Sequence, residues 1–309
     1  MIKFEKICIA LLITVLFFSC GRIVNSGNDL AEMNLNGKVE SLKEVKYQLA
    51  CKIDGITKDF ILNTNDYLFN KNGNVIELYL YDWATDSHGN VTSKYDEKGN
   101  KIEMSVDIYD SFLSHKITWR YDVKSNIIEE CRYDFNDSLY YKSILKYNEK
   151  DNKIEECEYS STGGLDKRYS FKYDKKNNKI EENMYNSNSS LDYKKTFKYD
   201  KNGNKIEGCE YSSTGGLDKR YSFKYDKKNN KIEEYMYNSN SSLDYKKTFK
   251  YDKNGNKIEG CYYAFDGVLE QLDTYKYEFD EKGNWIKQLE FTSMTPTNFM
   301  IEREIIYYE

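Results

Sequence analysis

Hydrophobic and polar residues alternate along most of the chain with a period of two. Between positions 165 and 173 the odd positions carry leucine, lysine, tyrosine, phenylalanine and tyrosine, whereas Arg168, Ser170 and Lys172 lie at even positions. This alternation is typical of an antiparallel β-strand with one buried face and one face in water. No segment after position 20 spaces its apolar residues with a helical period. We therefore expect an all-β protein.

The alternating segments belong to copies of one phrase, in which an aromatic residue is followed by Asp or Asn, by Asn five positions on and by Ile seven positions on. Residues 157–208 and 209–260 differ only at Asn183 and Tyr235. A fixed period of about 26 residues predicts stacked supersecondary units in one array rather than two separate domains. The aromatic residues that begin the copies are Phe69, Tyr95, Tyr121, Tyr147, Tyr173, Tyr199, Tyr225, Tyr251 and, two residues late, Phe279.

Each phrase predicts a β-hairpin. Asp174 can cap the turn through its side chain, and Asn177 lies where other copies have a glycine suited to a left-handed backbone. A four-residue loop built on a type I turn places Tyr173 opposite Ile180. The same register places Lys172 opposite Glu181, as a cross-strand pair of opposite charges.

The alternation slips after each turn, and two interpretations stay open. A β-bulge at Glu155–Glu156 brings Ile154, Cys157 and Tyr159 to the apolar face. Without a bulge, Tyr159 lies on the polar face. We favour the bulge, which also predicts two pairs across the next turn: Tyr159 with Leu165, and Ile154 with Tyr169.

The copies predict a long antiparallel meander of tandem hairpins. Residues 35–68 form a non-repeating start with two strands, the array covers about 69–291, and a terminal strand covers 301–308. We expect Glu302, Arg303 and Glu304 to shield a free sheet edge. Because sheets twist and long sheets curl, we expect a twisted, curled single sheet or partial barrel. The alternative is an open layer covered by tyrosines.

The N-terminal residues predict the cellular localisation of the protein. Lys3 and Lys6 precede a short apolar run over 7–18, and Cys20 follows directly after a serine. We expect a lipoprotein signal peptide over 1–19, cleavage before Cys20, lipidation of Cys20 and a flexible tether over 20–34. Residues 35–309 would then form a single domain anchored by lipid in a bacterial cell envelope, at the outer membrane. An ordinary signal peptide with an incidental cysteine is the alternative.

Composition argues against several classes of function. The net charge is -5, with lysine and glutamate interleaved, so no basic face for nucleic acid is expected. Phosphate-binding loops and nucleophile motifs are missing from the sequence, and we expect neither an enzyme nor a cofactor. A hydrolase in the irregular ends, using Asp54, Asp59 or Glu302, is a minor alternative.

The seven cysteines predict neither bridges nor a metal site. Neighbouring copies would be two strands apart, about 10 Å, which is beyond disulfide reach. We expect small buried fillers, and because His88 and His115 have no ligand motif around them, no metal is expected. The four cysteines that share one phase of the repeat are Cys131, Cys157, Cys209 and Cys261.

One row of tyrosines, beside rows of lysine and glutamate, is the candidate binding surface. Its rings could stack on a glycan or contact a protein, or they could simply cover the sheet. We expect a non-enzymatic binding module for glycan or protein, with a structural spacer or surface-coat protein without a ligand as the alternative. The row consists of Tyr133, Tyr159, Tyr185, Tyr211, Tyr237 and Tyr263.

The repeated Tyr-Asp-x-x-Gly-Asn-x-Ile phrase resembles the YD repeats of the RHS family. The whole plan is similar to YD-repeat lipoproteins of Bacteroidetes and spirochaetes, with Leu35-Asn36-Gly37-Lys38-Val39 near the start and Gly283-Asn284-Trp285-Ile286 near the end. The resemblance implies a β-repeat architecture and an envelope location. Large RHS proteins build a β-shell around a C-terminal toxin, whereas this chain has far fewer copies.

Overall fold

The computed structural model describes residues 28–52, 55–109, 114–294 and 298–309. These residues form one short helix and twenty strands. The elements are α3 Asp29–Glu32, β1 Val39–Lys52, β2 Gly55–Phe69, β3 Val75–Asp82, β4 Ser87–Tyr95, β5 Lys101–Ile108, β6 His115–Tyr121, β7 Ile127–Tyr133, β8 Leu139–Tyr147, β9 Lys153–Ser160, β10 Leu165–Tyr173, β11 Lys179–Asn186, β12 Leu191–Tyr199, β13 Lys205–Ser212, β14 Leu217–Tyr225, β15 Lys231–Tyr237, β16 Leu243–Tyr251, β17 Lys257–Ala264, β18 Leu269–Phe279, β19 Trp285–Thr292 and β20 Asn298–Tyr307.

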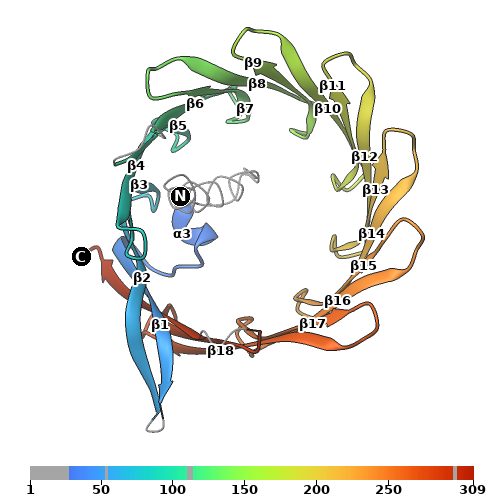
Figure 1. Ribbon diagram of the computed structural model, residues 1–309. Helices are drawn as coiled ribbons and strands as arrows, with labels where there is room; N and C mark the ends of the chain where they lie inside the picture. The colour runs from blue at the N-terminus through green and yellow to red at the C-terminus, as the bar shows by residue number, and fades with distance from the viewer. Residues whose placement is uncertain (1–27, 53–54, 110–113, 295–297) are drawn as a thin grey trace.

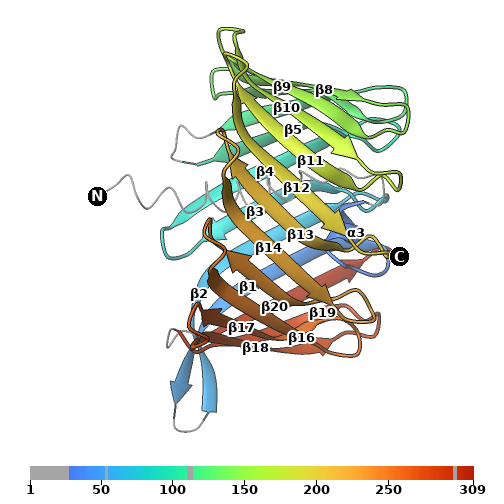
Figure 2. The same cartoon turned by 90° about the vertical axis from the view of Figure 1, so that its right-hand side faces the viewer.

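The strands close into a single barrel. Each strand pairs with its neighbours in sequence, and β20 also pairs with β1, antiparallel throughout. Figure 1 shows the resulting ring, and Figure 2 shows the strands tilted across its wall. The all-β antiparallel meander is confirmed, and the curl is complete rather than partial. Barrels of this many strands enclose a wide interior, the lumen.

The strands β1 and β20 meet at a seam that contains a buried ion pair. Arg303 Nε lies 2.8 Å from Glu44 Oε1, and their side chains are only 7% and 16% exposed. The Arg303 guanidinium also lies 3.3 Å from the centre of the Trp285 ring. The expectation that charges on the terminal strand shield a free edge is wrong, because that edge is paired with β1.

The predicted turn chemistry is confirmed. Asp174 Oδ1 accepts hydrogen bonds from the backbone N–H groups of Lys176 at 2.8 Å and Asn178 at 2.9 Å. Asn177 has a left-handed backbone, with φ 65°, where Gly203 of the next copy has φ 86°. The side chain therefore satisfies the backbone donors of the loop, as a capping residue does.

The expected register holds at one pair and fails at the next. Lys172 lies opposite Glu181, as predicted, but Tyr173 lies opposite Lys179 and not Ile180. The loop with the left-handed Asn177 closes one position earlier than the predicted loop, so Ile180 becomes the extra residue of a β-bulge. The equivalent isoleucines Ile102, Ile154, Ile206 and Ile258 are 36–38% exposed.

The bulge predicted at Glu155–Glu156 is therefore misplaced by one to two residues. The register shift lies at Ile154, between the pairs Lys146–Glu155 and Tyr147–Lys153. Tyr159 does lie opposite Leu165, as expected, but Tyr169 faces Glu156 rather than Ile154. Tyr159 consequently shares the polar face, as the alternative interpretation placed it, although that interpretation expected no bulge in this strand.

The aromatic residue of one copy binds the copy before it. The hydroxyl of Tyr173 donates to the carbonyl oxygen of Lys153, beside the bulge, at 2.8 Å. The first copy has Phe69 instead, whose side chain is fully buried. The same hydroxyl-to-carbonyl bond spans 2.7–3.0 Å at Tyr95, Tyr121, Tyr199, Tyr225, Tyr251 and Tyr277.

The tyrosine of the last copy also explains the late Phe279. Tyr277, rather than Phe279, donates to Lys257 O at the usual separation of 20 residues. Strand β18 then continues for two more residues before its turn. The copy is therefore not shifted, but extended.

The segment expected to be a flexible tether is ordered from residue 28 onward. Its helix α3 is capped by Asn28, whose side chain accepts from Ala31 N at 3.1 Å, and the helix lies inside the ring. The backbone N–H of Leu30 donates to Gly73 O at 3.1 Å, and the Leu30 side chain, 6% exposed, packs in the core with Phe69 and Val39. The expectation for 28–34 is wrong because an apolar residue and a capping residue dock this segment on the first turn.

The N-terminal segments on which the predicted localisation rests lie outside the described residues. This applies to the signal peptide over 1–19, to Cys20 and to the tether up to residue 27. In the part of the chain that the structure describes, no helix is long and apolar enough to cross a membrane.

Candidate functional site

The barrel wall has two faces with different chemistry. Phe69 and its equivalents point to the lumenal face, since Phe69 packs with Leu30 of the enclosed helix α3. By strand alternation Tyr173 and Phe171 share that face, whereas Lys172 lies on the outer face. Lys172 is 67% exposed, as expected for a side chain on the convex side of a curved wall.

The candidate tyrosine row lies on the outer face. Each of its six members is half-buried, and each lies opposite a leucine of the following strand. On the preceding strand each lies opposite a lysine or arginine. The structure thus aligns the predicted residues Tyr133, Tyr159, Tyr185, Tyr211, Tyr237 and Tyr263 at one level of the wall, in every second strand.

The cations beside this row follow two patterns. Some lie over the rings: Arg168 is 4.3 Å from the Tyr185 centre and Arg220 is 4.1 Å from the Tyr237 centre, with longer distances of 5.0 and 5.6 Å at Tyr133 and Tyr263. Lys142 and Lys194, opposite Tyr159 and Tyr211, instead bind Glu129 at 2.7 Å and Glu181 at 2.8 Å. The rings therefore lie among fixed charges.

Glutamates tie neighbouring strands together beside the row. Glu181 accepts from Lys172 at 2.7 Å on one side and from Lys194 at 2.8 Å on the other. These two hydrogen bonds lower the pKa of Glu181 to about 2. Lys172 is well exposed, so its share is screened by solvent. Glu181 and its two lysine partners are therefore all charged at neutral pH.

The cysteines of the repeat are free thiols on the same outer face. Cys131, Cys209 and Cys261 are buried and Cys157 is half-buried. Burial raises the pKa of the Cys131 thiol, as it does for Cys157. These positions agree with the expected role as small fillers rather than bridges.

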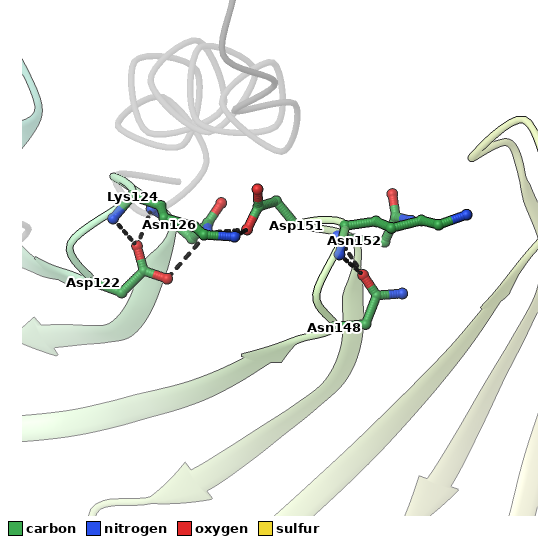
Figure 3. Close-up of polar contacts among 7 residues, drawn as sticks. Asp122, Lys124, Asn126, Asn148, Asp151 and Asn152 are labelled. Carbon is green, nitrogen blue, oxygen red and sulfur yellow. Dashed lines mark hydrogen bonds and ion pairs between the residues drawn. The ribbon is translucent and has the colours of Figure 1, made fainter.

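The turns at one end of the barrel form a polar rim (Figure 3). Asn126 Nδ2 donates to Asp122 of its own turn at 3.0 Å and to Asp151 of the next turn at 3.2 Å. Lys124 adds an ion pair of 2.8 Å to Asp151, and its hydrogen bond lowers the pKa of that carboxyl. The asparagine of the repeated phrase thus links consecutive turns as well as closing its own.

The described residues show no group of side chains suited to hold a metal ion. Within ranges 28–52, 55–109, 114–294 and 298–309, no three His, Cys, Asp or Glu residues gather in a way that could hold a metal ion. His88 lies in an aromatic cluster, with ring centres of Tyr109 and Tyr81 at 4.6 and 5.9 Å. Of the residues of the hydrolase alternative, Asp54 lies outside the described residues, Asp59 is exposed and Glu302 binds Lys58 at 2.6 Å.

The lumenal face carries a second group of polar and aromatic residues that the sequence analysis did not single out. Lys179 binds Glu182 at 2.6 Å and lies 5.3 Å from the Phe171 ring centre. Burial raises the pKa of Glu158, which accepts from Tyr141 at 3.1 Å. A depression of about 510 Å³ opens between β16, β17 and β18. Its signal in the sequence is glycine at position 260, where four other copies have Glu130, Glu156, Glu182 and Glu234.

Comparison with known proteins gives only distant likenesses. No protein-family model matches the chain, and no curated protein matches it. Among solved structures, a chain of the Photorhabdus luminescens Tc holotoxin pore, which contains TccC3, aligns at 10% identity and a TM-score of 0.36, over 78% of this chain and 16% of its own. This chain thus spans about a sixth of that chain's length.

Two other solved structures align over most of their length. A porin-like protein from Bacteroides uniformis aligns at 9% identity and a TM-score of 0.36, over 87% of this chain and 98% of its own. A LolA-superfamily protein from Nitrosomonas europaea aligns at 8% identity and a TM-score of 0.22, over 89% and 88%. At such identities and TM-scores these likenesses carry no argument about function.

Proposed function

We propose that this protein is a non-enzymatic binding module, anchored by lipid at Cys20 to the outer membrane of a bacterial cell envelope, that holds a glycan or protein ligand on its outer tyrosine row. The observation that carries the proposal is the alignment of six half-buried tyrosines at one level of the wall, each beside a cation and a leucine. Tyrosine rings fixed in this way lose little conformational freedom on binding.

The spacing of the row favours an extended, repetitive ligand. Members of the row are two strands apart, about 10 Å along the wall. A ligand with several equivalent groups would touch several rings at once, and weak contacts would add up through high effective concentration. The neighbouring ion pairs, such as Lys172–Glu181, would supply polar contacts to hydroxyl or amide groups.

The test is direct binding with a matched control. The mature chain carrying Tyr185→Ala, Tyr211→Ala and Tyr237→Ala is compared with wild type on an array of bacterial surface glycans and envelope proteins. We expect a loss of affinity of at least tenfold. The control carries Ile154→Ala, Ile206→Ala and Ile258→Ala, which removes exposed apolar groups at the bulges, away from the row, and should leave binding unchanged. Equal binding by the tyrosine variant would overturn the proposal.

A structural spacer or surface-coat protein is the second candidate. It is favoured by the half-burial of the same rings between leucines and cations, which suits a covering role. In that case no array ligand binds, and a knockout phenotype is rescued by the tyrosine variant as well as by wild type. Mass spectrometry of the mature N-terminus tests the anchor, since an amino end without fatty acid at Cys20 would exclude it.

A further inference from the structure

The turns at the end of the barrel opposite the polar rim expose large apolar side chains. Helix α3 docks at the polar rim, where Leu30 N donates to Gly73 O at 3.1 Å. Because neighbouring strands are antiparallel, every second hairpin turn lies at the other end, which we call the opposite rim (Figure 2). Six side chains at this rim are 50–71% exposed: Trp83, Tyr109, Phe135, Phe265, Val268 and Met294.

These six residues, the apolar arc, occupy neighbouring turns around the seam. Phe265 and Val268 lie between β17 and β18, and Met294 follows β19. Beyond the seam of β20 with β1, the arc continues in the turns after β3, β5 and β7. The β1–β2 hairpin between them exposes Ile56 as well. The four remaining turns, between β9 and β16, contain only Ser, Thr, Asn and Gly, so the apolar side chains are confined to one part of the rim.

The fold of these turns does not require an apolar residue at the tip. In the turn that carries Phe265, Ala264 N donates to Val268 O at 2.9 Å, and the turn that carries Ser213 has the equivalent bond at the same length. Phe265 thus takes the position of a serine in an otherwise identical turn. At 71% exposure its ring adds little to the packing of the barrel. Exposed apolar groups gathered at one edge are typical of a contact surface.

The turns of the apolar arc carry no basic side chain. Residues 83–86, 134–138 and 264–268 include aspartates but no lysine or arginine. Asp134 Oδ1 accepts from two backbone N–H groups of its own turn, at 2.8 and 3.0 Å. Asp266 Oδ1 accepts from Val268 N at 3.0 Å, and Asp137 lies 2.6 Å from Lys116 Nζ. These carboxylates have partners within the protein, and the turns offer no positive charge of their own to anionic lipid.

We propose that the apolar arc dips into the interface of a lipid bilayer with neutral, zwitterionic headgroups. Tyrosine and tryptophan suit this boundary because their rings are apolar and their polar groups stay in water. The strength of such binding grows with the apolar area that enters the interface. The proposal takes from the proposed function only the location at a membrane. It uses neither the outer tyrosine row nor the lipid on Cys20.

The spacing of the arc favours a bilayer over a protein partner. Neighbouring turns are two strands apart, about 10 Å along the rim. Each turn presents one or two apolar side chains among polar neighbours, as Phe265 and Val268 do beside Asp266. A fluid bilayer can receive all of these side chains at once, whereas the binding energy of a protein interface is concentrated in one packed cluster.

The experiment gives the arc the residues of the sibling turns. The mature chain 20–309 with Cys20→Ser, which excludes lipidation, is sedimented with vesicles of pure phosphatidylcholine. We expect the further changes Phe135→Ser, Phe265→Ser and Val268→Ser to lower the partition coefficient about tenfold or more, because three apolar groups no longer enter the interface. Serine occupies these positions in sibling turns, so the thermal midpoint should stay that of the parent chain.

The matched control is Val123→Ser, which removes an apolar tip of 89% exposure from the polar rim. It should bind vesicles as the parent chain does, and glycan or protein binding by the outer tyrosine row should be unchanged in the triple serine variant. Vesicles of phosphatidylcholine and phosphatidylglycerol in equal parts should bind the parent chain no more tightly than pure phosphatidylcholine.

Three results would overturn the proposal. The first is a parent chain that does not sediment with phosphatidylcholine vesicles. The second is equal partitioning of the triple serine variant and the parent chain. The third is binding that requires phosphatidylglycerol, which would assign the membrane contact to exposed lysines of the polar rim such as Lys175 and Lys227. Self-association of the parent chain that is lost in the triple variant, without vesicle binding, would assign the arc to a second copy instead.

Discussion

The hydroxyl of Tyr199 donates to the carbonyl oxygen of Lys179, twenty residues earlier, at a distance of 2.8 Å. This bond joins two consecutive copies at the bulge, where the strand ladder is interrupted. It explains why nearly every copy begins with tyrosine and not with phenylalanine. Because repeats gain stability from their neighbours, such a bond acts on the whole ring.

The first prediction removes this hydroxyl. Tyr199→Phe leaves the Lys179 carbonyl without its phenolic partner, and we expect a loss of about 1 kcal/mol in the free energy of unfolding. Urea titration monitored by circular dichroism measures it. Tyr211→Phe, on the outer face, is the control and should change the free energy by much less. Equal losses in both variants would contradict the assigned role.

The second prediction concerns the seam. Arg303→Leu leaves Glu44 buried without its guanidinium, which costs about 3–5 kcal/mol for a buried pair broken on one side. Limited proteolysis should then cut β20 faster than in wild type. Lys58→Met breaks the more exposed pair with Glu302 and should cost less than about 1 kcal/mol. A seam that resists proteolysis in Arg303→Leu would show that this pair does not hold the barrel closed.

The third prediction is a dependence of stability on pH. The folded-state pKa of Glu181 is lowered to about 2 from its ordinary value of 4.5. Its contribution is therefore present above pH 4.5 and is lost as the pH falls from 4.5 toward 2. At pH 6 we expect Glu181→Gln to be less stable than wild type by about 1 kcal/mol, allowing for solvent screening of the lysines.

Unfolding titrations at several pH values between 6 and 2.5 measure this difference, which should shrink as the pH falls. The double variant Lys172→Met, Lys194→Met serves as the control, because it removes both donors to Glu181. In that background Glu181→Gln should have little effect at any pH. A constant difference across the range would contradict the role of the ion pairs.

The fourth prediction concerns the turns. Gly203 has φ 86°, so Gly203→Ala forces a side chain into the left-handed region and costs about 1–2 kcal/mol. Gly208→Ala is the control, because Gly208 has an extended backbone and a Cβ there would meet its nearest neighbour at 3.7 Å. Denaturant unfolding compares the two. Asn177→Gly, at an equivalent turn, should be neutral or stabilising.

The sequence predicts most of the strands because the copies share their turn residues and an alternating segment before each turn. Asp174 and Asn177 mark the turn, and Lys172 forms the predicted cross-strand ion pair with Glu181. The predicted partner of Tyr173 is wrong, because a left-handed residue in the loop brings Lys179 rather than Ile180 opposite it. A bulge at Ile180 then restores the register. Alternation alone does not report such compensating shifts.

Closure and the lumenal site were harder to predict. Arg303 looks like an edge charge until β1 is known to lie beside it, a pairing between residues far apart in sequence. Likewise Asn28 and Leu30 show no helical period, since α3 has only four residues. The lumenal depression depends on Gly260 lying opposite Phe249 and on Tyr262 lying opposite Lys247, which requires the true register.

The almost identical segments 157–208 and 209–260 each contribute four strands to the ring. Recombination between them would delete or add strands only in even numbers, so the terminal strand would still arrive antiparallel to β1. The circumference of the barrel can thus grow or shrink in steps over evolutionary time while the seam between β1 and β20 is kept. Related proteins with this architecture are expected to differ in strand number and therefore in barrel diameter.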